Sequence, residues 1–231
     1  HFIFQILPYK FYHGVEHQKS TVIVLGPGYN LNEGKTYEDL LGVSSHELYH
    51  AWNVKYIRPM EMLPYDFTKE NYCRTGYVYE GFTTYYGDVM LRKSGVFTDE
   101  QYFETLEERL QKHFHNYGRF NLSVAQSSWD TWLDGYVPGA PYRKTSIYDE
   151  GNLVAFILDV LIQKNTYNKR SLKDVCRALY NDYGKKNKGY SENDIIKLCE
   201  DAAGISLSDV FNNYVYGTED FEPILNKCFE Y

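Results

Sequence analysis

The stretch that decides the chemistry of this chain is Ser45-His46-Glu47-Leu48-Tyr49-His50-Ala51-Trp52. It lies within residues 37–56, a segment that predicts a long helix. Two helical residues four apart lie about 40° apart around the axis and about 6 Å apart along it, so the His46 and His50 imidazoles can reach one ion. Imidazole is a good zinc ligand. Glu47 can lean toward the ion without binding it, which suits a general base that takes a proton from an attacking water.

A catalytic zinc needs a third protein ligand and an open position. The candidate is Glu80, within Tyr77-Val78-Tyr79-Glu80-Gly81-Phe82-Thr83, near the start of a second predicted helix. A carboxylate among aromatic residues is costly unless it is paired or bound to a metal. The alternative for Glu80 alone is a helix-start acid favoured by the helix dipole. The less favoured alternative for the two histidines is that they are solvated on an amphipathic helix. Taken together, the three residues are interpreted as zinc ligands.

The composition is that of a globular protein. The chain has 231 residues, of which 43% are hydrophobic and 24% are charged, enough for one large domain or two small ones. Its net charge of −7 and its lack of a basic cluster argue against nucleic-acid and anionic-membrane binding. The longest apolar run, Leu153 to Ile162, contains Asp159 and is too short for a bilayer, so it predicts a buried helix. We therefore expect a soluble protein, with its compartment and oligomeric state left open.

The cysteines and the first residues of the chain indicate little about function. None of Cys73, Cys176, Cys199 and Cys228 belongs to a C-x-x-C pair, which excludes zinc-ribbon and thioredoxin motifs. Four cysteines in a chain of this length do not make a disulfide scaffold and do not indicate a redox compartment. The chain opens on His1 without a charged leader, so we expect an excised domain that begins inside a strand and carries no targeting segment.

The remaining pattern predicts a small N-terminal sheet followed by helices, which is the α+β class. Strands are expected at Phe2–Leu7 and Thr21–Leu25. An irregular stretch, Gly118–Thr145, contains Gly135, Pro138, Gly139 and Pro141 and is long enough to be functional. Beyond the first helix, which stops before Pro59, helices are expected at Val78–Lys93, Thr98–His115, Tyr148–Lys164, Ser171–Tyr183, Ser191–Ala203 and Ser206–Tyr214, the last three with serine N-caps. We treat residues 1–231 as one catalytic domain, with subdomains at about 1–95 and 96–231.

With these motifs in place, the chain resembles the glycyl aminopeptidase family of metallopeptidases. The resemblance implies a thermolysin-like catalytic domain of the gluzincin type, with one zinc held by His46, His50 and Glu80. Members usually carry an N-terminal β-rich domain and a C-terminal PDZ-like domain, neither of which fits within these residues. The matching segments follow the family order: Gly14–Thr21, His46–Lys55, Ile57–Pro59, Glu80–Asp88 and Tyr148–Gly151.

The resemblance also implies roles in substrate binding and catalysis. Glu16, after Gly14 and Val15, stands where related aminopeptidases hold the free α-amine of the substrate. The strand after Phe11 would then run beside the zinc cleft, although Glu16 is equally an ordinary acid of an edge strand. Tyr148 stands where that group has a tyrosine that donates to the oxyanion, worth about 3 kcal/mol. The alternative is that Tyr148 is one more aromatic among 24 tyrosines.

Other polar residues near the motifs have expected places. Asn53, Thr84 and Asp88 are candidates to orient the ligand imidazoles, although Asp88 is rotated off the Glu80 face of a regular helix. Glu150 stands where the family pattern often has lysine, so we expect it to alter the charge of the cleft. The pair His113 and His115, two apart, point to different sides, which favours the end of a surface helix.

The sequence thus predicts a zinc metallopeptidase, an aminopeptidase that hydrolyses peptides with a free N-terminus and favours small first residues such as Gly or Ala. Glu47 would be the general base, and Tyr148 would stabilise the oxyanion. Three alternatives stay open: an endopeptidase of the same fold, a catalytically silent peptide-binding module, and a structural zinc site. A silent module would be expected to lose Glu47 or a ligand, and a structural site would be rich in cysteine.

Overall fold

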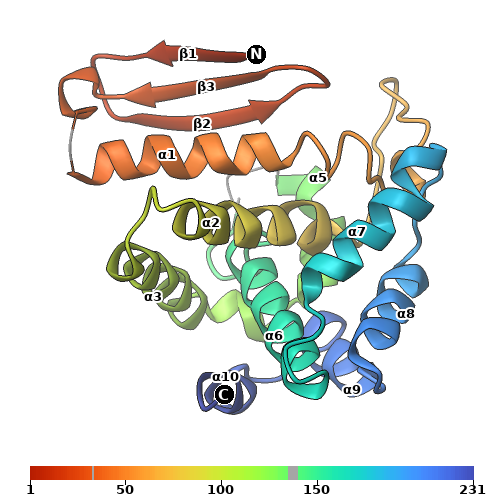
Figure 1. Ribbon diagram of the computed structural model, residues 1–231. Helices are drawn as coiled ribbons and strands as arrows, with labels where there is room; N and C mark the ends of the chain where they lie inside the picture. Colours follow the sequence, from red (N-terminus) through yellow and green to blue (C-terminus); the bar gives the residue numbers. More distant parts are fainter. Residues whose placement is uncertain (33, 135–139) are drawn as a thin grey trace.

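The computed structural model of the protein describes residues 1–32, 34–134 and 140–231. A three-stranded sheet lies along one side of helix α1 (Gly34–Tyr49), and the other helices lie on the opposite side of α1 (Figure 1). The strands β1 (Phe2–Ile6), β2 (Phe11–Glu16) and β3 (Thr21–Gly26) are arranged in the order β1-β3-β2. The centre strand β3 pairs parallel with β1 and antiparallel with β2, which places Glu16 opposite Thr21. This arrangement confirms the predicted α+β class.

The sheet packs on α1 through the alternate residues of β3. Ile23 and Leu25 are buried against Val43 of α1, because successive side chains of a strand point to opposite faces. The helix ends at Tyr49, earlier than the predicted Tyr56, so that boundary was wrong. The chain then winds through wider turns, in which Lys55 N donates to His50 O (3.2 Å) and Ile57 N donates to Trp52 O (2.8 Å). His50 keeps its helical bond to His46 O (3.2 Å), so the spacing of the two histidines survives.

The second predicted helix begins as a π-helix, Tyr77–Phe82, and continues as α2 (Thr83–Lys93). Glu80 lies within the π-helical turn, a feature that is frequent at functional sites. The turn packs directly on α6 (Asp149–Asn165), and the contact is backbone to backbone: a Cβ on Gly81 would collide with the backbone of Gly151. The absence of a side chain at both positions therefore sets the distance between the turn and α6.

Substituting Gly81→Ala is expected to lower the free energy of unfolding by about 1–3 kcal/mol, because the added methyl has no space beside Gly151. The measurement is equilibrium denaturation in urea. The matched control is Gly42→Ala on α1, where an added Cβ meets no atom within 4 Å. That control should be neutral or stabilising by about 0.5–1 kcal/mol, since alanine is the better helix former. Equal effects from the two substitutions would contradict the packing argument.

The remaining helices form the core of the molecule around α6. Helix α3 (Asp99–His115) begins with the predicted Thr98–Gln101 capping box. The run Leu153–Ile162 is a buried part of α6, as predicted, and its Asp159 accepts from Tyr85 Oη (2.6 Å) and Leu172 N (2.7 Å). The chain continues through α7 (Leu172–Asp182), α8 (Glu192–Ala203), α9 (Ser208–Val210), a π-helix (Phe211–Val215) and α10 (Glu222–Phe229). Among the described residues, no helix is long and apolar enough to cross a membrane.

Some of the helix boundaries predicted for the chain after α3 were wrong. The stretch expected to be irregular holds a 3₁₀ turn (Tyr117–Phe120), α4 (Val124–Trp129) and α5 (Thr131–Asp134). The missed signal is a second capping box, Ser123 with Gln126, which satisfies the first amides of α4. Residues 135–139, and with them Gly135, Pro138 and Gly139, lie outside the described part. Ser191 caps its helix as predicted and Ser171 is the N-cap of α7, but α9 has Leu207 at the N-cap position, and α10 was not predicted.

Candidate active site

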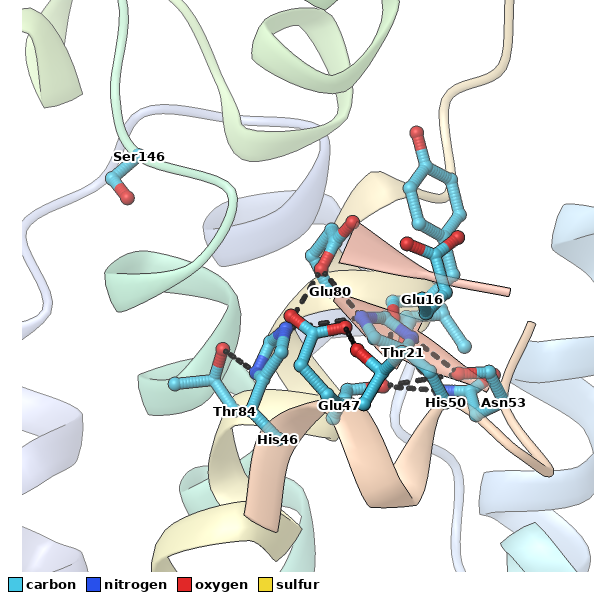
Figure 2. A network of polar contacts seen from close by, with 12 residues as sticks. Glu16, Thr21, His46, Glu47, His50, Asn53, Glu80, Thr84 and Ser146 are labelled. Atoms are coloured by element: carbon cyan, nitrogen blue, oxygen red, sulfur yellow. Dashed lines mark hydrogen bonds and ion pairs between the residues drawn. The ribbon is translucent and has the colours of Figure 1, made fainter. Parts of the chain in front are cut away.

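Three candidate ligand atoms meet where α1 ends beside the π-helical turn (Figure 2). His46 Nε2 and His50 Nε2 are 3.0 Å apart, and Glu80 Oε2 lies 3.3 Å from each of them. A tetrahedral zinc with bonds of about 2.0–2.1 Å separates its ligand atoms by about 3.3 Å. The three atoms therefore have the spacing of one face of a zinc tetrahedron, before any ion is considered.

The hydrogen bonds around the imidazoles suit a cation at their centre. His50 Nδ1 lies 2.6 Å from the backbone oxygen of Asn53, which only accepts, so this nitrogen carries a proton. His46 Nδ1 lies 3.4 Å from Thr84 Oγ1. Glu80 Oε2 is buried and accepts no hydrogen bond from any described residue. The Nε2 lone pairs of the two histidines thus converge with Glu80 Oε2, and contacts to the Nδ1 atoms orient the imidazole rings. This arrangement is typical of a metal site.

The electrostatics of the cluster also favour positive charge. Burial opposes a charged His50, but the neighbouring Glu80 carboxylate outweighs it and raises the pKa of His50 to about 9. Burial likewise opposes a charged Glu80, yet the two imidazoles lower the pKa of this carboxyl to about 2. The pKa of His46 is lowered, chiefly by burial. Glu80 is therefore ionised, and its charge is to be balanced by a cation among these residues.

Glu47 lies beside this cluster and is only 7% exposed. Burial raises the pKa of its carboxyl to about 7, which is close to the optimum for a general base at neutral pH. Thr21 Oγ1 lies 3.3 Å from Glu47 Oε2 and 2.9 Å from the backbone oxygen of Val15. A Cβ on Gly14 would collide with the Glu47 carboxylate, so only glycine lets β2 pass this close. The sheet thus holds the carboxylate in place from the side opposite α1.

Glu16 faces the same cluster from the end of β2 (Figure 2). Glu16, Glu47 and His50 each offer a polar atom within 4.8 Å of the others. The strand after Phe11 therefore runs beside the candidate metal site. Lys55 Nζ contacts Glu16 Oε1 at 3.0 Å, and both side chains are partly buried. Lys55 lies within the motif His46–Lys55, but nothing in the sequence near it indicates that its side chain reaches β2.

Tyr148 lies at the N-terminus of α6, with its ring centroid 6.1 Å from that of His46. Asn53 acts near His50 through its backbone oxygen, while its amide donates to Val78 O (2.9 Å) and Thr83 Oγ1 (3.1 Å). These bonds tie the segment after α1 to the π-helical turn. Thr84 contacts His46, as described above.

Asp88 is directed elsewhere. It contacts Arg109 Nε (3.4 Å) and Asn152 Nδ2 (3.3 Å), so it joins α2 to α3 and α6 and contacts neither ligand imidazole. This direction agrees with the expectation that Asp88 is rotated off the Glu80 face of the helix, and a role for Asp88 in orienting the imidazoles stays a prediction.

The expectations for His113 and Glu150 were wrong, because both side chains are buried. His113 does not lie at a surface helix end: its side chain is fully buried, and Nδ1 lies 3.1 Å from Glu150 Oε2. Glu150 also accepts from Thr145 Oγ1 (2.5 Å) and is 2% exposed, so it does not set the charge of the cleft. His115 is exposed, as predicted. The error arose because the i,i+2 spacing says which sides the rings face but not what covers each side.

The fold is similar to that of a solved aminopeptidase structure. A similar crystal structure is that of an aminopeptidase N family protein from Idiomarina loihiensis, with a TM-score of 0.86 and 26% sequence identity. The similarity covers 97% of this chain and 40% of that protein, so this chain spans well under half of its relative. No curated protein matches the sequence.

The family assignment rests on the sequence of the site itself. The family model of the M61 glycyl aminopeptidases matches residues 39–154, about half of the chain, and the chain belongs to that family. The matched segment contains His46, Glu47, His50, Glu80 and Tyr148. Glu16 lies outside it, so the family match does not bear on the role of Glu16.

Proposed function

We propose that this chain is the catalytic part of a zinc aminopeptidase, of the thermolysin-like gluzincin type, that removes small N-terminal residues such as Gly or Ala from peptides. The observation that carries the proposal is the convergence of His46 Nε2, His50 Nε2 and Glu80 Oε2 beside the buried Glu47. The three atoms would hold one zinc per chain. Membership in a family of glycyl aminopeptidases supports the same reaction class.

A bound zinc would supply Lewis-acid chemistry, polarising the scissile carbonyl and making water more acidic. Glu47 takes a proton from the attacking water and later returns it to the leaving amine. Thr21 and the β2 backbone at Gly14 keep this carboxylate beside the cluster. The Tyr148 hydroxyl donates to the oxygen that becomes negative as the carbonyl is attacked. The silent-module alternative is disfavoured because no residue of this set is missing.

Exopeptidase action would come from Glu16. In this proposal the Glu16 carboxylate, at the end of β2, pairs with the α-ammonium of a substrate whose first peptide bond lies at the cluster. The proximity of Glu16 to Glu47 and His50 supports this role. The alternative within the same fold is an endopeptidase, in which Glu16 serves another purpose. The two differ in whether the substrate needs a free N-terminus.

The test compares Gly- or Ala-initiated peptides with their N-acetyl forms. Acetylation removes the ammonium charge, and loss of such a pair costs about 2–5 kcal/mol, or roughly 30- to 4,000-fold in kcat/KM. The wild type should show this preference, and Glu16→Gln should lose most of it. Cleavage of acetylated peptides at internal bonds, at rates equal to those of the free peptides, would instead support the endopeptidase.

Lys55 is expected to weaken binding of the free amine, because its ammonium already occupies Glu16 at 3.0 Å. Lys55→Met should therefore lower KM for free-amine peptides by about 2- to 5-fold, with kcat little changed. This change corresponds to the free energy of a partly exposed ion pair. The control is Lys19→Met, which removes the same charge from an exposed site near β2. A higher KM in Lys55→Met would mean that Lys55 orients Glu16 rather than competing with the substrate.

A further inference from the structure

The two residues that follow Tyr148 are both held by helix α3. Arg109 Nη1 lies 2.8 Å from Asp149 Oδ1, and His113 Nδ1 lies 3.1 Å from Glu150 Oε2. Arg109 and His113 are four residues apart and so project from one face of α3. One helix face thus contacts the first two residues of α6, immediately after the tyrosine that faces His46.

The His113–Glu150 contact is buried, and the Arg109–Asp149 contact is partly buried. Arg109 is also 3.4 Å from Asp88 on α2, so its guanidinium joins three helices. The Glu150 carboxylate also accepts from Thr145 (2.5 Å), and the ring of His113 packs on Phe221 at 4.7 Å between centroids. Buried charged groups tolerate little displacement, because an unpaired partner is costly. The start of α6 is therefore fixed relative to α3 and α2.

The position of Tyr148 depends on the position of the start of α6. Its backbone oxygen accepts the amide of Asn152 (2.8 Å) as the first bond of α6. Its ring lies 6.1 Å from His46, which belongs to α1 and is not part of the contacts with α3. The distance between Tyr148 and the ligand cluster hence depends on where α3 holds Asp149 and Glu150.

We propose that Arg109 and His113 are positioning residues that hold Tyr148 at the reaction centre through Asp149 and Glu150. This inference rests on the proposed function, in which Tyr148 donates to the oxyanion. A displacement of about 1 Å in such a donor lowers the rate by up to about 100-fold, so the contacts act on kcat more than on substrate binding.

The experiment is a double-mutant cycle on kcat, with Arg109→Gln, His113→Gln and Tyr148→Phe made singly and in pairs. Arg109→Gln and His113→Gln should each lower kcat about 10-fold or more, with KM changed less than about 3-fold. In the Tyr148→Phe background the same substitutions should have almost no further effect on kcat, since the group they position is gone. A crystal structure of Arg109→Gln should show the Tyr148 ring displaced from its 6.1 Å separation from His46.

Two further variants complete the experiment: one replaces Arg109→Gln if that protein does not fold, and the other is a control for the loss of an ion pair. Asp149→Ala removes the same contact but leaves Arg109 its partner Asp88, so it serves if Arg109→Gln does not fold. Arg92→Gln breaks an exposed Arg–Asp pair with Asp99 and should leave kcat unchanged. Metal content and thermal unfolding are measured for every variant.

The outcomes separate the inference from the proposed function. Effects on kcat that multiply in the Tyr148→Phe background, or a wild-type kcat in Asp149→Ala, overturn the positioning role. A wild-type kcat in Tyr148→Phe overturns it as well, whereas the zinc peptidase proposal stands if Glu47→Gln is inactive. A metal-loaded wild type that cleaves no peptide overturns both.

Discussion

Glu47→Gln is expected to keep its metal and to lose peptide hydrolysis by roughly 100- to 10,000-fold in kcat, because the general base is removed. The amide has the size of the carboxylate and still accepts from Thr21, so the sheet and α1 should stay in place. It cannot take the proton that the buried carboxylate, with its pKa raised by burial to about 7, takes at neutral pH. The measurement is kcat on an Ala-initiated peptide together with metal content.

The matched control for this result is Glu107→Gln, which makes the same chemical change at an exposed position of α3. It should hydrolyse the peptide at the wild-type rate. Near-normal turnover in a folded, metal-loaded Glu47→Gln protein would refute the mechanism proposed for this residue.

His46→Ala is expected to lose stoichiometric zinc and, with it, activity. The remaining His50 and Glu80 supply two ligands, one fewer than the usual set in a catalytic zinc site. Zinc should also raise the unfolding temperature of the wild type, because a ligand that binds only the folded state stabilises it. The variant should lose this response, as measured by metal analysis and thermal unfolding with and without added zinc.

The control for metal binding is His115→Ala, which removes an exposed histidine of α3. It should retain both the zinc and the shift in unfolding temperature. Stoichiometric zinc in His46→Ala would contradict the assignment of the ligands.

The elements that the sequence predicted best are those decided by local geometry. The spacing of His46 and His50 implies convergence on any helix, and the pair stays together although α1 ends at Tyr49. The Thr98–Gln101 capping box marks the start of α3 through bonds that span only four residues. The order of the motifs, together with the resemblance they carry, indicated Glu80 and the family.

The features that the sequence did not predict depend on residues distant along the chain. A π-helical turn differs from an α-helix by one hydrogen-bond register, and nothing in Tyr77–Phe82 alone marks it; it accompanies the close packing of Gly81 on Gly151. The partners of Asp88, which are Arg109 and Asn152, likewise come from other helices and are not indicated by the sequence near Asp88.

Residue patterns along the chain thus predict the α+β class, the helix that carries His46, Glu47 and His50, and the family. The surroundings of those residues follow only from the packing of distant segments: the Glu16–Lys55 contact, the burial of Glu47 beneath β2, and the pairing of His113 with Glu150. The two sets of features differ in the range of the interactions that fix them. Helix spacing and capping act over a few residues, whereas burial and ion pairing depend on which segments pack together, and these segments lie tens of residues apart.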